Sequence, residues 1–318
     1  MSPMLSVVVP AYNEAARLGK NLPLIFKFLN RHNIDSEVIV VDDGSTDKSL
    51  EILKTFEEKD KNVRVYSFRK NLGKSEALTY GFMQAKGDYV VTLDADLQDQ
   101  PSEISKLLAK AGEGIEVVCG WRKDRKDKSN MKFISKIFNN VLKKLFGLDI
   151  HDYNCGLKVY TKEAAKSLRL YGGLHRFIPL LAYQQGFAVD EVAVHHEPRK
   201  FGKSKYGFSK VWKDLPDIFS VVFLANFSKR PLHFFGPVGG VIFFTGVIVF
   251  TYLSLIWLQG ESIGTRPLFF VSIFLILGGL QILFTGFLAD LIINIAHTQR
   301  TANESLLHFP LKYKSDKE

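Results

Sequence analysis

Two aspartates, Asp94 and Asp96, are separated by one residue in the stretch TLDADLQD. They come directly after the apolar run YVVTL. A chain turns where a strand ends, so both carboxylates can face one ligand there. Hard carboxylate oxygens suit Mg²⁺ or Mn²⁺, which bind through one or two carboxylates together with substrate phosphates. The spacing therefore predicts a divalent metal site that holds a phosphorylated donor. A plain acidic turn is the alternative, because an isolated Asp-x-Asp pair is a weak signal.

Strands of a sheet must position these acids. Apolar, β-branched runs predict strands at 5–14, where Pro10 ends the run, and at 36–47, 62–68 and 89–96. Helical spacing lies between them at 15–32, 46–59 and 74–85. Continuous Val and Ile runs that alternate with helices are typical of a largely parallel sheet covered on both faces. Ligands of such sheets bind beyond the carboxyl ends of the strands. We therefore expect residues 10–14, Asp42, Asp43, Asp94 and Asp96 on one rim.

The composition limits the class of protein. The formal net charge of +9 over 318 residues favours an anionic partner: a phosphorylated ligand, a membrane surface or nucleic acid. Nucleic acid explains neither the acidic rim nor the apolar C-terminal third, so it is excluded as the partner. Cys119 and Cys155 give neither a disulfide framework nor a zinc spacing. The N-terminus lacks a basic region and a long apolar core, so we interpret it as a first strand and not as a signal peptide.

Residues 231–295 differ in kind from the rest of the chain. The stretches 232–258 and 267–289 contain no Asp, Glu, Lys or Arg, and about 20 apolar residues are enough to cross a bilayer core. We predict two transmembrane helices, at about 232–258 and 267–293; two buried helices of a soluble core are the alternative. Basic residues flank the pair, so the positive-inside rule predicts an inner-membrane protein whose termini and N-terminal domain are cytoplasmic.

These spans divide the chain into four predicted parts: an α/β domain at 1–207, a juxtamembrane helix at 208–230, the spans at 231–295 and a tail at 296–318. The segment 130–148 and the juxtamembrane helix both combine apolar residues at helical spacing with lysines, as interfacial helices do. Packing of each on the sheet is the alternative. The glycine pairs in PVGGV and LGGL permit close packing of helices, which suits a homo-oligomer without establishing one.

The stretches VVVPAYNE, VIVVDDGSTD, NLGKSEALTYGFMQAKGDYVVTLDADLQD and HDYNCGLKVY resemble family 2 glycosyltransferases, and within them the polyprenyl-phosphate glycosyltransferases. The resemblance implies a GT-A fold and inverting transfer of a hexose from a nucleotide sugar to a polyprenyl phosphate, with Mg²⁺ or Mn²⁺ as cofactor. It implies that Asp94 and Asp96 hold the metal and that Gln98 lies near the sugar phosphate. The residues that it implies for the nucleotide sugar are Pro10, Tyr12, Glu14, Asp42, Asp43, Gly73, Lys74 and Asp94.

An acceptor phosphate is mostly ionised at neutral pH, so it needs positioning and charge neutralisation more than it needs a strong base. Arginine binds phosphate bidentately, and lysine acts as a point charge. We predict that the phosphate is bound by Arg122, Arg125, Arg176 and Lys205. General attraction to anionic lipids is the alternative, above all for the lysines.

Asp152, in HDYNCGLK, matches the family position near the sugar and the acceptor. The match implies that it orients the acceptor or acts as a base, and ordinary capping of a loop is the alternative. His151, beside it, is expected to be structural.

The donor and the activity have alternatives. The two-span tail resembles that of the bactoprenol-type members, which implies UDP-glucose as the first donor expected. GDP-mannose is the second. A processive polysaccharide synthase is a second enzyme class, but its Gln-x-x-Arg-Trp stretch is not found in the sequence. A membrane adaptor that binds nucleotides without turnover is the non-enzymatic alternative.

Overall fold

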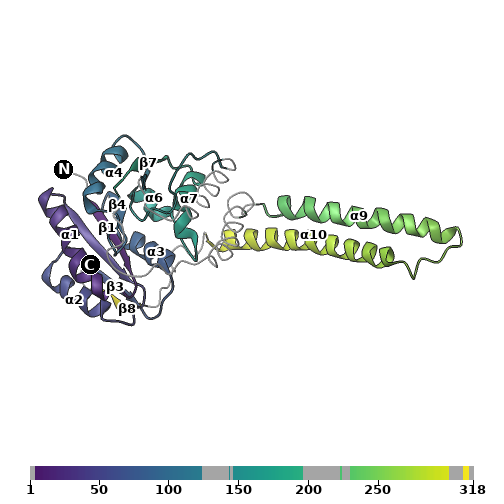
Figure 1. Ribbon diagram of the computed structural model, residues 1–318, viewed down its shortest axis with the longest axis horizontal. Coiled ribbons are helices and arrows are strands. Elements are labelled where there is room, and N and C mark those ends of the chain that lie inside the picture. The colour runs from purple at the N-terminus through teal and green to yellow at the C-terminus, as the bar shows by residue number, and fades with distance from the viewer. Residues whose placement is uncertain are drawn as a thin grey trace. The chain divides into compact units, whose positions relative to one another are not determined.

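The computed structural model describes residues 4–123, 143, 146–195, 223, 230–300 and 311–314. The chain divides into two compact units (Figure 1). The α/β unit comprises Met1–Lys210 with His308–Glu318, and the helical unit comprises Val211–Leu307. The interfacial helices predicted at 130–148 and 208–230 lie almost entirely outside the described residues.

Within the described residues, one eight-stranded sheet forms the centre of the α/β unit (Figure 1). β4, β1, β2 and β3 are parallel neighbours, whereas β6 runs antiparallel to β4 and β5, and β8 antiparallel to β3. The sheet is therefore mostly parallel, as the sequence predicted. In spatial order the strands are β7 (Val189–Ala193), β5 (Val117–Trp121), β6 (Lys158–Thr161), β4 (Tyr89–Thr92), β1 (Leu5–Ala11), β2 (Ser36–Asp42), β3 (Val63–Phe68) and β8 (Leu311–Lys314).

Side chains alternate between the two faces of the sheet, because successive residues of a strand point to opposite sides. One set, which includes Val7, Val9 and Val40, forms a buried cluster with residues of α1 (Ala15–Arg31), α2 (Ser49–Lys59) and α4 (Ile104–Ala111). The neighbouring position Val8 meets Gly81 of α3 (Lys74–Gln84), and a Cβ at Gly81 would collide with the Val8 side chain. Helix α3 thus packs closely on the opposite face from α1, α2 and α4.

Pro10 lies inside β1, whereas the sequence placed it at the end of the strand. It pairs with Val41 of β2, and the strand continues to Ala11. On its other side, β1 pairs with β4 only as far as Val8 opposite Thr92. Proline lacks the N–H that a central strand must donate, and it is tolerated here because β4 has already ended.

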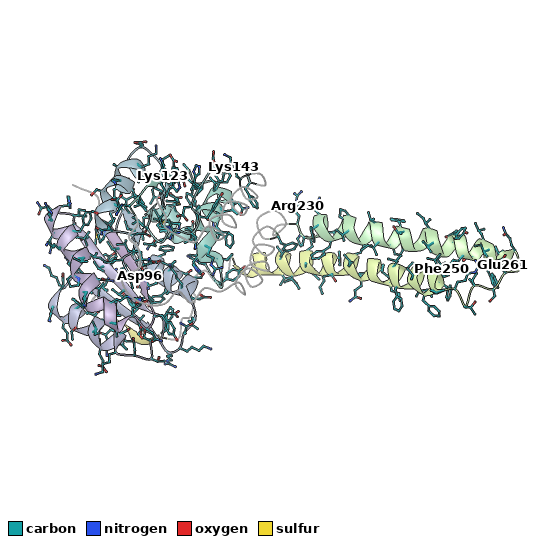
Figure 2. The ribbon with its side chains drawn as sticks, in the orientation of Figure 1. Asp96, Lys123, Lys143, Arg230, Phe250 and Glu261 are labelled. Atoms are coloured by element: carbon teal, nitrogen blue, oxygen red, sulfur yellow. The ribbon has the colours of Figure 1, made fainter. Side chains whose placement is uncertain are left out.

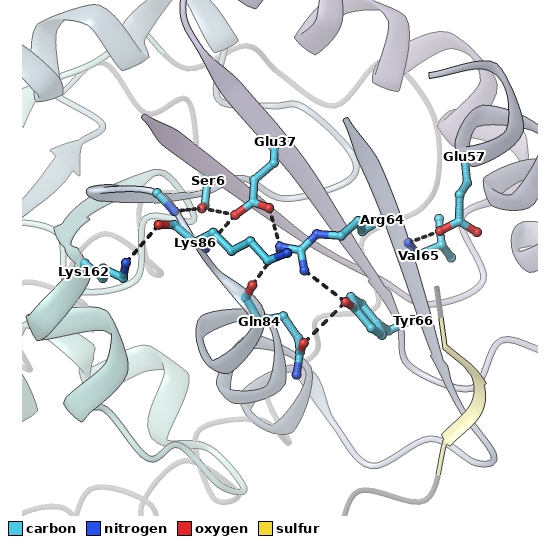
Figure 3. A network of polar contacts seen from close by, with 10 residues as sticks. Ser6, Glu37, Glu57, Arg64, Val65, Tyr66, Gln84, Lys86 and Lys162 are labelled. Atoms are coloured by element: carbon cyan, nitrogen blue, oxygen red, sulfur yellow. Dashed lines mark hydrogen bonds and ion pairs between the residues drawn. The ribbon is translucent and has the colours of Figure 1, made fainter. Parts of the chain in front are cut away.

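A buried polar network fastens the amino ends of the strands, opposite the predicted rim (Figure 3). Glu37 of β2 forms an ion pair with Arg64 of β3, and it accepts hydrogen bonds from the Ser6 hydroxyl at 2.5 Å and the Lys86 N–H at 2.7 Å. Arg64 also donates to the Gln84 carbonyl at the end of α3. Buried charges require such partners, and the network therefore ties α3 to three strands.

The helical unit is a hairpin of α9 (Leu232–Leu258) and α10 (Pro267–Arg300) (Figure 1). Both helices are long and apolar enough to cross a membrane, and only 11% of each apolar window is buried. A core helix of a soluble protein would be mostly buried, so these helices fit a membrane protein. In Figure 2, Phe250 and Glu261 lie near the connector and Arg230 lies at the opposite end of the hairpin.

The two glycine pairs divide their roles within the hairpin. A Cβ at Gly239 would lie 2.8 Å from the Gly279 carbonyl oxygen, and a Cβ at Gly279 would collide with the backbone of Phe243. Their neighbours Gly240 and Gly278 have no atom within 4 Å of such a Cβ among the described residues. One glycine of each pair therefore brings α9 and α10 together, and the predicted homo-oligomer remains a prediction.

The segment predicted as a tail contributes a strand to the sheet. Tyr66, Ser67 and Phe68 of β3 pair with residues of β8. The Tyr313 hydroxyl donates to the buried carboxylate of Glu57, and the Lys54 ammonium lies 4.3 Å from the centre of the Tyr313 ring. The chain thus returns to the α/β unit after α10.

Candidate active site

The sheet brings the predicted acids to one edge. Strands β2, β1 and β4 are adjacent and parallel, so the residues that follow them meet at the carboxyl ends. Figure 2 shows Asp96 in the α/β unit. Residues 10–14, Asp42–Asp43 and Asp94–Asp96 all occupy this rim, as parallel pairing requires.

The loops after β1 and β2 hold each other. Asn13 has a positive φ of 53°; its N–H donates to the Ser45 hydroxyl at 2.9 Å, and its side-chain oxygen accepts from the Thr46 N–H at 2.8 Å. These bonds fix the loop that carries Tyr12, which is 44% exposed, and Glu14, which forms an ion pair with Arg17 at 2.6 Å. A half-exposed aromatic ring on a fixed loop is suited to contact a planar base.

Asp42 and Asp43 are both buried, and both have local partners. Asp42 accepts from the Ser67 hydroxyl at 2.6 Å. Asp43 accepts from the Leu72 N–H at 2.7 Å and from the Gly73 N–H at 3.0 Å. Burial raises the pKa of Asp43 despite these hydrogen bonds. Gly73 has a φ of 118°, a conformation that favours glycine, so Asp43 shapes the turn that begins α3.

Asp94 is paired with the first residue of α3. The Lys74 ammonium lies 2.5 Å from the Asp94 carboxylate, and both side chains are partly exposed. Desolvation opposes ionisation of Asp94, but Lys74, followed by Lys158 and Arg122, outweighs it and holds the pKa below its ordinary value. A Cβ at Gly156 would lie 2.6 Å from this carboxylate. Glycine at 156 therefore gives Asp94 its space.

Asp96 lies in the turn that follows β4. The Leu97 N–H donates to the Asp94 carbonyl at 3.0 Å, and the Asn21 side chain of α1 donates to the Ala95 carbonyl at 2.7 Å. The Gln98 N–H lies 3.4 Å from an Asp96 carboxylate oxygen. Hydrogen bonds within the turn and from α1 therefore fix the short segment that carries both carboxylates.

Two carboxylates fit a divalent cation that shares its shell with a donor diphosphate. Mg²⁺ and Mn²⁺ need only one or two protein carboxylates in such sites. In the described residues no group of three or more His, Cys, Asp or Glu side chains forms a closed metal site. Asp94 and Asp96 are the two rim carboxylates that could hold such a cation.

The structure joins two residues that were predicted to have separate roles. Arg122, at the end of β5, holds Asp152 with two hydrogen bonds, Nε–Oδ2 at 2.6 Å and Nη2–Oδ1 at 3.0 Å. Both side chains are about nine-tenths buried. Burial opposes the charge of Arg122, but the bonds and the charge of Asp152 raise its pKa above the ordinary value. Arg122 thus directs two of its donors to Asp152.

The other predicted cations differ in what the structure shows of them. Arg176 lies in η2 (Leu174–Phe177), which packs against α3. Its neighbour His175 contacts the Ser75 hydroxyl through Nδ1 at 2.9 Å. Burial, with the charges of Lys74 and Arg176, lowers the pKa of His175 to about 3. Arg125 and Lys205 lie outside the described residues.

A groove of about 750 Å³ reaches the rim beside Asp96. Residues of the 96–102 segment form one wall, and the other wall is the outer side of α1. Helix α1 was expected only to cover the sheet, and its polar wall was not predicted, although the three-to-four-residue spacing of its basic residues is a signal for it. The basic residues of that wall are Arg17, Lys20, Lys27 and Arg31.

Residues 6–169 match the family model described as glycosyl transferase family 2. The chain is 33% identical over 296 residues to a dodecaprenyl-phosphate galacturonate synthase of Rhizobium johnstonii, covering 91% of this chain and 87% of that protein. It is 34% identical over 295 residues to an undecaprenyl-phosphate 4-deoxy-4-formamido-L-arabinose transferase of Shewanella sediminis, covering 91% and 86%. The chain therefore belongs to glycosyl transferase family 2, which confirms the resemblance.

Solved structures of more distant proteins share the fold. Glucosyl-3-phosphoglycerate synthase of Mycobacterium tuberculosis, bound to phosphoglyceric acid, matches with a TM-score of 0.56 and 20% identity, over 70% of this chain and 80% of that one. The same enzyme with Mn²⁺, UDP-glucose and phosphoglyceric acid matches with a TM-score of 0.53 and 19% identity, over the same shares. The α/β unit thus has the GT-A fold that the sequence predicted.

Proposed function

We propose that this protein transfers a sugar from a nucleotide sugar to a polyprenyl phosphate at a membrane surface. The observation that carries the proposal is the combination, in one chain, of the acidic GT-A rim and the apolar hairpin. The likeness to the two relatives extends over 91% of this chain, and their names specify a dodecaprenyl or undecaprenyl phosphate. A processive synthase and a nucleotide-binding adaptor lack comparable support.

On the donor side, Asp94 and Asp96 would hold Mg²⁺ or Mn²⁺. The ion would neutralise charge on the departing nucleoside diphosphate. Tyr12, on its fixed loop, would contact the base. Lys74 forms an ion pair with Asp94. Its ammonium would therefore lie close enough to a bound diphosphate to interact with its negative charge. Gln98, beside Asp96 in the same turn, would contact the sugar phosphate.

On the acceptor side, a phosphate oxygen forms the new bond to C1 of the sugar while the bond from C1 to the nucleoside diphosphate breaks. The diphosphate leaves with the electron pair, and the configuration at C1 inverts. An ionised phosphate has no proton to lose, so Asp152 need not act as a base. Its bidentate pair with Arg122 suits it to orient the acceptor, while Arg176, Arg125 and Lys205 would supply positive charge.

The sugar is proposed only as a class. The two relatives are named for galacturonate and for 4-deoxy-4-formamido-L-arabinose, and neither name supports the glucose or mannose that we expected from the sequence. Nucleotide-linked forms of all four sugars are therefore the donors to compare, with UDP-glucose and GDP-mannose as the hexose candidates.

A donor screen with the full chain tests this function. The protein in detergent, with Mg²⁺ and undecaprenyl phosphate, is given each labelled nucleotide sugar. One donor should yield a lipid-linked product, and Asp96→Asn should slow its formation by about 100-fold or more. Asp35→Asn, an exposed change before β2, is the matched control. Absence of lipid-linked product with every donor would refute the proposal, and an unchanged rate for Asp96→Asn would refute the metal assignment.

A further inference from the structure

The last strand of the sheet, β8, supports the carboxyl end of β3. Tyr313 of β8 pairs with Ser67 of β3, and the register between the two strands shifts between Ser67 and Phe68. The Tyr313 ring packs against the buried cluster of the sheet, and its hydroxyl donates to one oxygen of the Glu57 carboxylate. The other Glu57 oxygen accepts from the Val65 N–H of β3 at 2.9 Å. Tyr313 therefore holds β3 both through strand pairing and through Glu57.

Ser67 connects this support to the rim. Its side chain is buried, and its hydroxyl donates to the Asp42 carboxylate at 2.6 Å. The same carboxylate accepts from the Ser45 N–H at 3.2 Å, and the Ser45 hydroxyl accepts from the Asn13 N–H at 2.9 Å. Asn13 belongs to the loop that carries Tyr12. A continuous line of hydrogen bonds thus joins β3 to Asp42 and to the Tyr12 loop, both of which were predicted to bind the nucleotide.

The direction of the Ser67 hydroxyl depends on the pairing with β8. β3 pairs with β2 on one side and with β8 on the other, so without β8 its carboxyl end would be an open edge. A shift of register changes the direction in which the side chains of a strand point, and here the shift directly follows Ser67. Strand ends with few partners also open locally. Loss of β8 would therefore weaken the hold of Ser67 on Asp42.

We propose that β8 is a functional part of the donor site, with Tyr313 and Ser67 as positioning residues that hold Asp42 for the nucleoside diphosphate. The inference rests on the proposed function, because it concerns the same donor. The family model matches residues 6–169, so β8 lies beyond the matched region. The segment that was predicted only as a tail thereby has a role in donor binding.

Nucleotide binding to the full chain in detergent tests the inference apart from turnover. Calorimetry with Mn²⁺ and UDP, and in parallel with Mn²⁺ and GDP, gives the Kd. Tyr313→Ala should raise the Kd of the nucleotide that the native chain binds by about 10-fold. Ser67→Ala should do the same, as the loss of a hydrogen bond to a charged group does. Tyr313→Phe keeps the ring and the strand pairing, so it should stay within about 3-fold.

The matched control and the double variant separate positioning from a general loss of stability. Tyr183→Ala, at a half-exposed site on α7 (Ile178–Gln184), should bind the nucleotide as the native chain does. If β8 acts through Ser67, Tyr313→Ala combined with Ser67→Ala should raise the Kd by about 10-fold, as each change does alone. A rise of about 100-fold would show two independent effects and overturn the inference. If Tyr313→Ala does not fold, Tyr313→Val replaces it in the same comparison.

Turnover gives a second readout. Tyr313→Ala should raise the KM for the nucleotide sugar by about 10-fold and leave the KM for undecaprenyl phosphate within about 2-fold, whereas equal rises in both would contradict the inference. If the native chain makes lipid-linked product and Tyr313→Ala binds the nucleotide equally well, the inference is wrong and the proposed function stands. If the native chain binds neither nucleotide and makes no product, the proposed function fails and the inference falls with it.

Discussion

The Asp94 side chain fits beside residue 156 only because that residue is glycine. In Gly156→Ala the new Cβ would lie 2.6 Å from the carboxylate, so Asp94 must move and its pair with Lys74 must loosen. We expect sugar transfer to be largely lost and the free energy of unfolding to fall by about 1–3 kcal/mol, as overpacking does. Thermal unfolding and transfer rates measure both effects.

Gly19→Ala is the matched control for that change. Among the described residues, no atom outside the backbone of α1 itself lies within 4 Å of a Cβ at Gly19, and alanine is the better helix former. This variant should therefore unfold at the native temperature or above and keep its activity. If Gly156→Ala behaves in the same way, the close fit against Asp94 is not required for the site.

His175 gives the protein a predictable pH dependence. The folded-state pKa of about 3 lies below the ordinary 6.5, because the buried ring sits near Lys74 and Arg176. Between these values the unfolded chain binds a proton that the folded chain excludes, so stability is fully present above pH 6.5 and falls as the pH drops towards 3. The loss is at most about 1.4 kcal/mol per pH unit.

His175→Asn should flatten this dependence. Asparagine carries no proton to exclude, and its amide can still donate to the Ser75 hydroxyl, which the His175 Nδ1 contacts at 2.9 Å. The unfolding temperature in detergent, compared at pH 7.5 and pH 5, should drop less for the variant than for the native chain. Equal drops would show that other groups set the acid sensitivity.

Part of the site is predictable from residue types and part is not. The acids at 42–43 and 94–96 are predictable, because parallel strands end together and each acid follows an apolar run. The pairing of Arg122 with Asp152 is not predictable, because 30 residues separate the two and no local spacing joins them. The same holds for His151 and Glu191, whose contact depends on β5 and β7 being neighbours.

At the scale of elements, the apolar runs and the helical spacing predicted β1 to β4 and α1 to α3. Most of the predicted ends lie within a few residues of the observed ones. β8 was missed, because the segment 311–314, LKYK, is too short to show a pattern. It becomes a strand through its partner β3 and through the contact of Tyr313 with Glu57. A short edge strand is thus a tertiary property more than a local one.

The hairpin offers a test with two adjacent residues. A side chain at Gly279 would collide with the Phe243 backbone, whereas one at Gly278 meets no atom within 4 Å in the described structure. Gly279→Leu should push α9 and α10 apart and lower the unfolding temperature in detergent by several degrees, since backbone contact requires small residues. Gly278→Leu should leave it nearly unchanged. An equal loss in both would show that α9 and α10 do not pack through this face.

For the whole molecule, strands that come before and after the hairpin in the chain belong to one sheet. β7 precedes α9 and β8 follows α10 in the chain, and both are strands of the α/β unit. If α9 and α10 cross a membrane, both ends must lie on one side and the connector at 259–266 on the other. The positive-inside rule predicts that this side is the cytoplasm.

Cysteine labelling of intact cells tests this topology. Ser262→Cys, in the exposed connector, should react with a membrane-impermeant maleimide. Glu58→Cys, on the exposed side of α2, should react only after the cells are permeabilised. Background should be low, because Cys119 and Cys155 are buried. Labelling of Glu58→Cys in intact cells would reverse the orientation.

The late position of β8 in the chain also sets an order of assembly. Translation reaches residues 311–314 only after both helices of the hairpin, so β3 keeps an open hydrogen-bonding edge until the hairpin has been made. An open edge can pair with other chains. Because β8 pairs with this edge, the sheet is completed only after the hairpin has been made. A chain released by a ribosome that stalls before β8 would have an unpaired edge on β3 that can pair with other chains.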